Sequence, residues 1–211
     1  MIKRNVCKIC RRLGQKLFLK GEKCSSPKCP MVKKPYPPGL QRKRRRAILL
    51  SEYGKELAEK QKLKNYYGLR EKQFKRYVEE ILKARGKVED AGILLIKKLE
   101  KRLDNVVFRL GFARSRREAR ELVSHGHFLV DSKPINIPSF QVEKGQVISV
   151  KESKKKKPYF KNLSVFLKNY QPPAWLKLDS QKLEGKIIEE PTGEDIGVPL
   201  DVSAIFEFYS R

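Results

Sequence analysis

Four cysteines lie close together near the start of the chain, and their spacing is typical of a metal site. They form two pairs with thirteen residues between them, and the members are Cys7, Cys10, Cys24 and Cys29. Two such pairs joined by a short loop can place four sulfur atoms around one tetrahedral Zn²⁺ ion. Because four cysteines leave no open coordination position, we expect a structural zinc and not a catalytic one. Two disulfides or free thiols are the alternatives.

The chain carries far more positive than negative charge. Its 211 residues include 49 Lys and Arg against 24 Asp and Glu, a formal net charge of +25 at pH 7. A polyanion would relieve this self-repulsion, so nucleic acid is the first candidate partner and an anionic membrane surface the second. The longest purely apolar runs are four residues, against about 20 for a membrane span. No secretory signal is apparent, so we expect a soluble, intracellular protein without membrane partners.

The positive charge is concentrated toward the N-terminus. Residues 1–46 contain sixteen Lys or Arg and one acid, whereas residues 184–211 contain seven acids and two bases. The acidic end is expected to face solvent, cations or another protein. The cationic run beyond the cysteines, and lysines on the helix predicted after it, are expected to contact phosphates and not merely to solubilise the chain. These residues are Arg42, Lys43, Arg44, Arg45, Arg46, Lys60, Lys62 and Lys64.

Hydrophobic periodicity predicts a helical first half followed by a small sheet. The expected helices are 51–67, 71–83, 93–111, 115–125 and 201–211. The expected strands are 16–20, 128–130, 135–137 and 146–150. In the last helix, Ile205, Phe206, Phe208 and Tyr209 are expected to be buried.

The helix predicted at 115–125 combines an N-terminal cap with clustered arginines. Ser115 and Glu118 have the spacing of a capping box. Cations one turn apart and the N-terminal amides of this helix could converge on phosphates. Two histidines without an acidic or cysteine neighbour do not make a metal site, so a loop role beside RNA is weighed against ordinary exposed histidines. The predicted RNA contacts of this segment are Arg114, Arg116, Arg117, Arg120, His125 and His127.

The segment 102–127 closely resembles the RNA-binding module named after the S-four family of small-subunit ribosomal proteins. The four cysteines and the motifs at 35–39, 59–63, 138–139 and 207–211 are also similar to bacterial members. The resemblance implies an α+β fold: an N-terminal zinc lobe, a helical domain completed by the C-terminal helix, and an inserted module of helix–turn–helix and small antiparallel sheet. The implied domains are 1–41, 42–97 completed by about 185–211, and 98–184.

The resemblance also implies a role in the cytoplasmic ribosome. A protein of this family would be a structural constituent of the small subunit that binds its ribosomal RNA directly. It would organise a multi-helix junction early in assembly and contribute to translational accuracy. The implied partners are ribosomal RNA, neighbouring small-subunit ribosomal proteins, and messenger RNA near its entry path. One departure from the family is the hairpin turn Asp131–Ser132, where Asn-Gly is common, and this is expected to cost turn stability.

Two other classes of function are kept as alternatives. A non-ribosomal RNA chaperone could carry the same module. The triplet Arg102-Leu103-Asp104 also resembles the catalytic motif of RNA pseudouridine synthases, but here it lies inside the binding module, without a separate catalytic domain. No nucleophile–base set or glycine-rich phosphate loop appears elsewhere. We therefore expect no enzymatic activity, and we expect Asp104 to pair with a nearby arginine.

Overall fold

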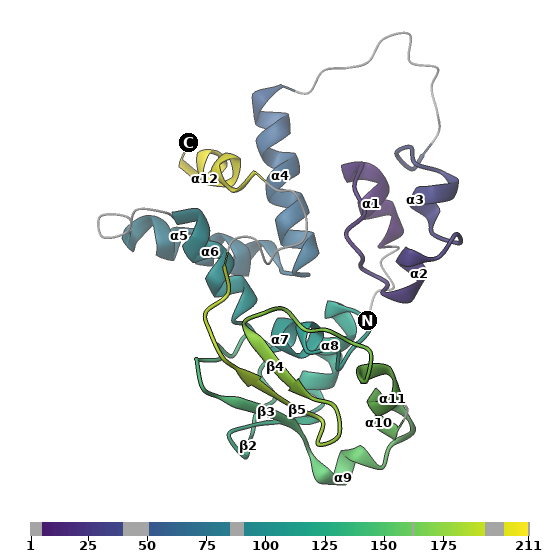
Figure 1. Cartoon of the computed structure of the whole chain (residues 1–211). Helices are drawn as coiled ribbons and strands as arrows, with labels where there is room; N and C mark the ends of the chain where they lie inside the picture. The colour runs from purple at the N-terminus through teal and green to yellow at the C-terminus, as the bar shows by residue number, and fades with distance from the viewer. Residues whose placement is uncertain (1–5, 40–50, 85–90, 162, 193–200, 211) are drawn as a thin grey trace. The chain divides into compact units, whose positions relative to one another are not determined.

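The chain divides into two compact units, the second inserted into the first (Figure 1). The computed structural model describes residues 6–39, 51–84, 91–161, 163–192 and 201–210. Unit 1 consists of residues 1–92 and 198–211, and unit 2 of residues 93–197. The predicted domain boundaries, after 97 and after 184, lie five residues after the first of these divisions and thirteen residues before the second. In the described part of the chain, no helix is both long and apolar enough to span a bilayer.

The regular elements in the described residues of unit 1 are all helices. Its helices are α1 (Cys7–Leu13), α2 (Glu22–Ser25), α3 (Pro30–Lys33), α4 (Glu52–Tyr66), α5 (Glu71–Ala84) and α12 (Val202–Ser210). The three long ones confirm predicted helices. Ser51 Oγ accepts a hydrogen bond from the Gly54 amide, and Asp201 Oδ1 accepts one from the Ala204 amide, so both predicted N-caps are present.

The strand predicted at 16–20 is wrong. The segment forms a loop and a turn, because Phe18 has a left-handed backbone with φ 50° that interrupts any extended run. Leu17 is buried while Phe18 is exposed. The alternation of apolar and polar residues therefore does not mark a strand. It places one buried side chain, Leu17, in the loop between α1 and α2.

One carboxylate joins the C-terminal helix to α4 and α5. Glu71 Oε1 accepts hydrogen bonds from Lys60 Nζ at 2.8 Å and from the Tyr209 hydroxyl at 2.9 Å, and Oε2 accepts one from Lys64 Nζ at 2.6 Å. The Lys60 ammonium is buried and lies 4.1 Å from the ring centroid of Phe208. Of the four residues of α12 that were predicted to be buried, Ile205 and Phe206 are buried, whereas Phe208 and Tyr209 are only half-buried. Residues far apart in the sequence therefore complete the packing of unit 1.

Unit 2 places helices against a five-stranded antiparallel sheet. Helix α6 (Ala91–Glu100) leads into it, and its other helices are α7 (Leu103–Arg109), α8 (Arg116–Ser124), α9 (Glu152–Lys155), α10 (Pro158–Lys161) and α11 (Leu163–Leu167). The strands are β1 (Phe128–Val130), β2 (Lys133–Pro134), β3 (Val147–Val150), β4 (Leu176–Asp179) and β5 (Glu184–Ile187). Their order is β2-β1-β3-β5-β4, with every pair antiparallel.

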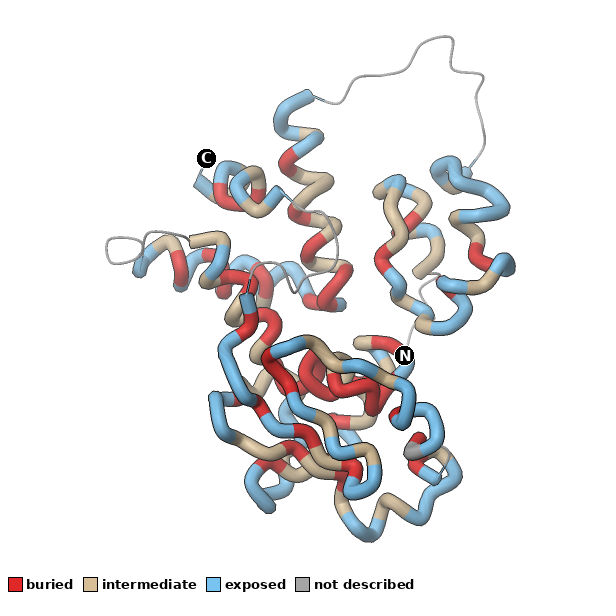
Figure 2. Tube along the Cα trace, in the orientation of Figure 1, coloured by how far each residue is buried: buried red, intermediate tan, exposed pale blue. Residues whose placement is uncertain are grey.

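The core of unit 2 lies between the sheet and the helices α7, α8, α10 and α11. Figure 2 shows buried residues along α7 and an alternation of buried and less buried residues along the strands. The core includes Leu103, Val107, Ala119, Phe128, Ile148, Phe160, Leu167 and Ile187. Strand β5 approaches α7 so closely that a Cβ at Gly185 would collide with the Leu110 side chain. That glycine is therefore required by packing between α7 and the sheet.

The predicted strands are confirmed at 128–130 and nearly so at 146–150, but the second one is displaced. Strand β2 begins at Lys133, because a two-residue turn pairs Val130 directly with Lys133. Asp131 and Ser132 have φ of 47° and 65°, as a type I′ turn requires. The positive φ angles of these two non-glycine residues are unfavourable. The Asp131 carboxylate offsets part of this cost by accepting a hydrogen bond from the Val147 amide at 2.9 Å. Strands β4 and β5 were not predicted.

The single helix predicted over 93–111 is also wrong, because the chain breaks it at Lys101–Arg102. Arg102 has an extended backbone (ψ 134°) and bridges antiparallel to Gln141. The Phe140 carbonyl accepts a hydrogen bond from the Leu103 amide, and the Lys101 carbonyl accepts one from the Val142 amide. A distant extended segment thus supplies the partners that a continuous helix would otherwise provide.

The Glu71 cluster makes the stability of unit 1 pH-dependent. Burial raises the pKa of Glu71, but the hydrogen bonds from Lys60, Lys64 and Tyr209 outweigh it and lower the pKa to about 2 from the ordinary 4.5. Because the folded pKa is the lower one, the stabilisation is complete above about pH 4.5 and is lost as the pH falls toward 2. We expect Glu71→Gln to lower the free energy of unfolding by about 1 kcal/mol at pH 7, solvent screening included.

Denaturant unfolding followed at several pH values measures this difference. The gap between Glu71→Gln and the parent chain should close as the pH falls toward 2. Glu79→Gln is the matched control, since Glu79 pairs with Lys75 at an exposed site and should change the stability by less than about 0.5 kcal/mol. A gap that stays constant with pH would contradict the assignment.

Candidate nucleic-acid interface

Helix α8 presents the arginine cluster, and local hydrogen bonds determine where it begins. Ser115 Oγ accepts a hydrogen bond from the Glu118 amide at 3.3 Å. The Glu118 carboxylate in turn accepts one from the Arg114 amide at 2.8 Å. These two contacts satisfy amides that a helix start leaves without intrahelical partners. The capping box predicted from the sequence is therefore present, although its return contact reaches Arg114.

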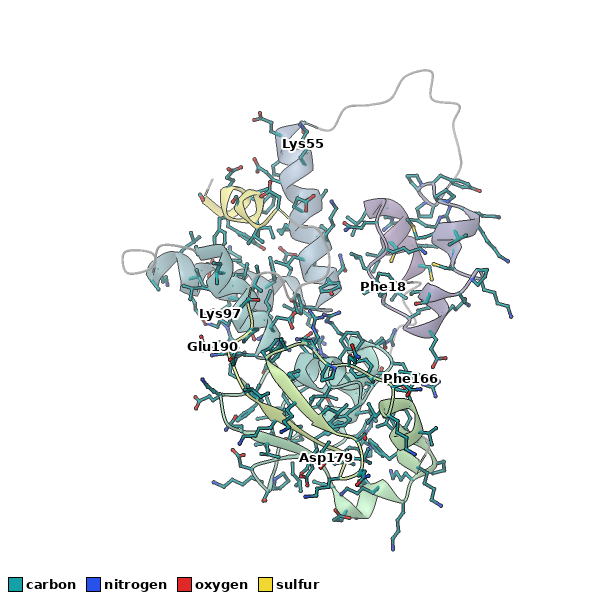
Figure 3. All side chains as sticks on the ribbon, viewed as in Figure 1. Phe18, Lys55, Lys97, Phe166, Asp179 and Glu190 are labelled. Carbon is teal, nitrogen blue, oxygen red and sulfur yellow. The ribbon has the colours of Figure 1, made fainter. Side chains whose placement is uncertain are left out.

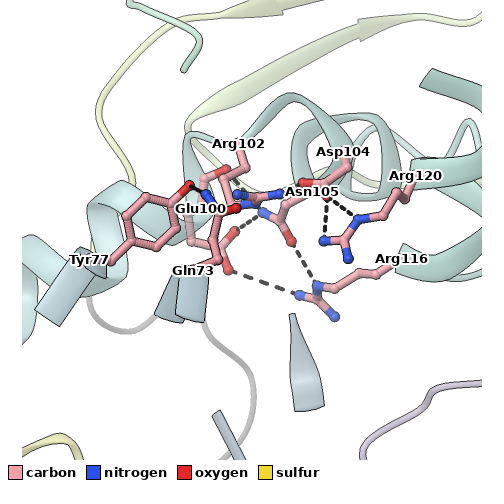
Figure 4. A network of polar contacts seen from close by, with 8 residues as sticks. All are labelled: Gln73, Tyr77, Glu100, Arg102, Asp104, Asn105, Arg116 and Arg120. Atoms are coloured by element: carbon pink, nitrogen blue, oxygen red, sulfur yellow. Dashed lines mark hydrogen bonds and ion pairs between the residues drawn. The ribbon is translucent and has the colours of Figure 1, made fainter. Parts of the chain in front are cut away.

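Behind α8 lies a buried ionic network, which we call the arginine network (Figure 4). It consists of Glu100, Arg102, Asp104, Asn105, Arg109, Arg116 and Arg120. Asp104 is 3% exposed and accepts hydrogen bonds from Arg102 and from Arg120, the latter at 2.7 Å and 2.8 Å. This confirms the expectation that Asp104 pairs with a nearby arginine.

The second carboxylate of the network is Glu100, which is fully buried. It accepts a bidentate pair of hydrogen bonds from Arg109, at 2.8 Å and 3.0 Å, and a third from Asn105 Nδ2 at 2.7 Å. The Asn105 side-chain oxygen accepts one from Arg116 Nε at 2.7 Å. Arg116 also lies over the Phe108 ring, 4.5 Å from its centroid. The inner acids therefore orient arginines from both α7 and α8.

The network carries an excess of positive charge. Its four arginines outnumber its two carboxylates, which leaves a net charge of +2 for the residues named above. Arg120 keeps 32% of its side-chain surface exposed while it contacts Asp104. A guanidinium has five N–H donors in a rigid fork, so one arginine can bind a carboxylate and a phosphate together. The arrangement can present fixed cations to a polyanion.

The predicted contacts on α8 divide into exposed and paired residues. Arg114 just before the helix, Arg117 on it and His125 just after it are exposed, and Arg117 forms an exposed ion pair of 3.4 Å with Glu121. Arg116 and Arg120 are held by the arginine network instead. The sequence predicted the cations of this helix but not the inner acids that orient some of them.

The predicted contacts on α4 are also engaged within the protein. Lys60 and Lys64 contact Glu71, and Lys62 pairs with Glu59 at 2.5 Å. Lys60 is buried and serves packing as much as charge. The run Arg42, Lys43, Arg44, Arg45 and Arg46 lies outside the described residues.

His127 is placed in the core of unit 2. It is 8% exposed, and its ring packs edge-on to Phe160 at 5.7 Å between centroids. Burial lowers the pKa of His127, and the nearby Lys157 and Lys154 lower it further. The neutral imidazole is thus favoured, and a packing role fits His127 better than a contact with RNA.

Sequence reasoning missed the polar residues that interrupt the apolar pattern of α6 and α7. Glu100 and Asn105 fall at helical spacing among buried Leu and Val residues. This pattern in the sequence could have predicted that both side chains are buried. It also missed Lys177 and Lys186, which face each other across β4 and β5. Like charges directly opposite are unfavourable without a neutralising anion, so this pair is a further candidate phosphate contact.

Other lysines of unit 2 are neutralised by acids. Figure 3 shows Lys97 and Glu190 pointing toward one another. The Glu190 carboxylate accepts hydrogen bonds from Lys97 at 3.1 Å and from Lys101. These hydrogen bonds lower the pKa of Glu190. Part of the acidic C-terminal stretch therefore serves contacts inside unit 2.

The cysteine segment folds into α1, α2 and α3 of unit 1. Cys10, Cys24 and Cys29 are buried and Cys7 is half-buried, and none of the four forms a disulfide. Burial raises the pKa of Cys10 and of Cys24, and repulsion from the other cysteines adds to both shifts. The side chains of the described residues do not form a group of three or more ligands that could hold a metal. By donor chemistry the four thiols fit zinc, but the zinc ion stays a prediction.

Comparison with known proteins gives matches along nearly the whole chain. The model described as ribosomal protein S4/S9 N-terminal domain matches residues 1–103, and the model described as S4 domain matches residues 101–148. A small ribosomal subunit protein uS4 from Halothermothrix orenii is 50% identical over 98% of this chain and 97% of its own length. Proteins of the same name from Caldicellulosiruptor saccharolyticus and Kosmotoga olearia are 51% and 46% identical, over 97% and 98% of this chain and 96% and 97% of their own lengths.

The arginine network should be sensitive to the loss of either acid. We expect Asp104→Asn to lower the free energy of unfolding of unit 2 by about 3 kcal/mol, because it leaves buried guanidinium charge uncompensated. Chemical denaturation followed by the fluorescence of Trp175, which lies in the unit 2 core, measures the change. Glu121→Gln removes an exposed partner of Arg117 and should cost less than about 0.5 kcal/mol. Equal effects of the two substitutions would refute the structural role of Asp104.

Proposed function

We infer that this chain, which belongs to the uS4 family of small ribosomal subunit proteins, is a structural constituent of the small ribosomal subunit that binds its ribosomal RNA directly. The match over nearly the full length of uS4 proteins is the observation that carries this conclusion. It places the protein in the cytoplasmic ribosome, with neighbouring small-subunit proteins as further partners. It also disfavours a non-ribosomal RNA chaperone built on the same module.

The protein binds and positions RNA without breaking bonds. The alternative of a pseudouridine synthase needs a reactive aspartate, whereas Asp104 is buried and its carboxylate is hydrogen-bonded to Arg102 and Arg120. This pairing argues against the synthase, and the match over nearly the full length of uS4 proteins supports a structural protein that is not an enzyme. Its arginines and lysines neutralise phosphates and release counterions, and the rigid scaffold fixes where those phosphates lie.

The finer role is the organisation of a multi-helix RNA junction early in assembly, with an influence on translational accuracy and a contact with messenger RNA near its entry path. The division of the chain into two compact units supports this proposal. Each unit carries its own cations, so one chain can contact more than one RNA helix. The arginine network adds preorganisation, because its guanidinium groups are oriented before RNA arrives.

Binding of small-subunit ribosomal RNA should weaken steeply as salt is raised. On a plot of log affinity against log salt, Arg117→Ala should reduce the slope by somewhat under one unit, because one phosphate contact is lost. Filter binding or fluorescence anisotropy with the full chain measures the slope. Glu121→Gln on the same helix should not reduce the slope. Equal affinity of the parent chain for unrelated structured RNA would overturn the proposed function.

We also propose that Cys7, Cys10, Cys24 and Cys29 hold one structural zinc ion. Their spacing, the burial of three of the four, and the hydrogen bond of 3.3 Å from the Lys20 amide to Cys24 Sγ support this. Burial, and to a smaller extent repulsion from the other cysteines, raises the pKa of Cys10, and a bound cation would offset both effects by stabilising the thiolates. When bound, the ion would supply folding free energy to a segment with few buried apolar side chains.

Metal analysis of the purified chain should find one zinc per molecule, and the same measurement would detect iron in its place. A strong chelator should unfold residues 7–33 and make the four thiols reactive, while the unfolding midpoint of unit 2 stays unchanged. Cys10→Ser should reproduce the effect of the chelator. A metal-free chain that keeps slow thiol reactivity would contradict the zinc proposal.

A further inference from the structure

Helix α11 exposes an unusual amount of apolar surface. Val165 and Phe166 are 68% and 58% exposed, the highest values among the large apolar residues of the described chain. They are adjacent, so they form one patch. Contiguous exposed apolar surface on a monomer commonly marks an interaction site.

This exposure is a fixed property of the helix. Leu163 and Leu167, which are four residues apart and share one face of α11, are 8% and 2% exposed and belong to the core of unit 2. Rotating the helix to bury Phe166 would expose both leucines. The patch therefore cannot be covered by a simple rearrangement of α11.

A second aromatic ring braces Phe166. The Tyr170 ring lies 6.0 Å from the Phe166 ring, with 30° between their planes. The Tyr170 hydroxyl donates a hydrogen bond of 3.1 Å to the Arg109 carbonyl, which ties Tyr170 to α7. Figure 3 shows Phe166 on α11 with its side chain outside the core. The Phe166 ring is therefore held by Tyr170 and remains exposed to solvent.

The segment that carries this ring is strongly cationic. Residues 151–170 contain seven lysines and one acid. Lys156 and Lys157 precede α10, Lys168 follows α11, and all three are exposed. Protein–protein interfaces are depleted in lysine, whereas sites for single-stranded nucleic acid combine aromatic side chains with positive charge.

We propose that α11 is a stacking platform for an unpaired RNA nucleotide, with Phe166 under the base and lysines of the segment 151–170 on the flanking phosphates. The proposal rests on the RNA-binding function inferred above and deepens it. An RNA duplex keeps its base faces stacked inside the helix, so the patch selects a loop, bulge or unpaired strand.

The test uses the full chain with Phe166→Trp, because the natural sequence has one tryptophan and Trp175 is buried. A short single-stranded oligoribonucleotide should quench the new fluorescence, and an RNA duplex of the same length should not. With small-subunit ribosomal RNA, Phe166→Ala should weaken binding about tenfold, a typical loss for one stacked base. Phe166→Leu should weaken it equally, because leucine preserves apolarity but not the aromatic face.

The matched control is Ile137→Ala, which removes another large exposed apolar side chain of unit 2, one that lies outside the lysine-rich residues 151–170. It should leave RNA affinity unchanged. Thermal unfolding confirms that each variant is folded. If the parent chain binds ribosomal RNA but Phe166→Ala and Phe166→Leu bind as well as it does, the stacking proposal is overturned and the proposed function survives. It is also overturned if Phe166→Leu binds normally while Phe166→Ala does not, or if Phe166→Ala only abolishes self-association in sedimentation.

Discussion

Two carboxylates inside unit 2, Glu100 and Asp104, tolerate burial only because arginines surround them. A buried acid without a partner would lose several kcal/mol of hydration or take up a proton. Here each acid instead accepts several hydrogen bonds from guanidinium groups on α7 and α8 and at the junction before α7. The same contacts join α6, α7 and α8 and orient Arg116 and Arg120. The geometry of the cationic surface therefore depends on charges that lie beneath it.

The break between α6 and α7 is part of the same construction. A continuous helix through Arg102 would carry its guanidinium away from the extended backbone that now bridges to Gln141. With the break, Arg102 and Asp104 form a buried pair at 3.0 Å. A segment that follows the first hairpin thus determines how the helical part of the module begins. The start of α7 therefore depends on residues about 40 positions further along the chain.

Unit 1 shows the same dependence on distant residues. Its helix α12 comes from the end of the chain, after the whole of unit 2, and contacts α4 and α5 through the cluster around Glu71. Lysines that look available for RNA in the sequence, Lys60 and Lys64, are engaged there. A high net positive charge therefore does not make every cation a phosphate contact, because some of them neutralise the acids that close the fold.

The sequence by itself determined the features that depend on residues near one another in the chain. Caps at Ser51, Ser115 and Asp201, the long helices, the first hairpin strand and the family motifs all follow from local hydrogen bonding and periodicity. Only the tertiary structure decided the break at Arg102, the strands β4 and β5, the burial of His127, and the division of the arginines into paired and exposed groups. Each of these depends on a partner far away in the sequence, such as Gln141 for Arg102 or Leu110 for Gly185. The energy of such contacts comes from burial and charge pairing between distant residues. A local pattern of residue types does not reveal which distant residues will meet.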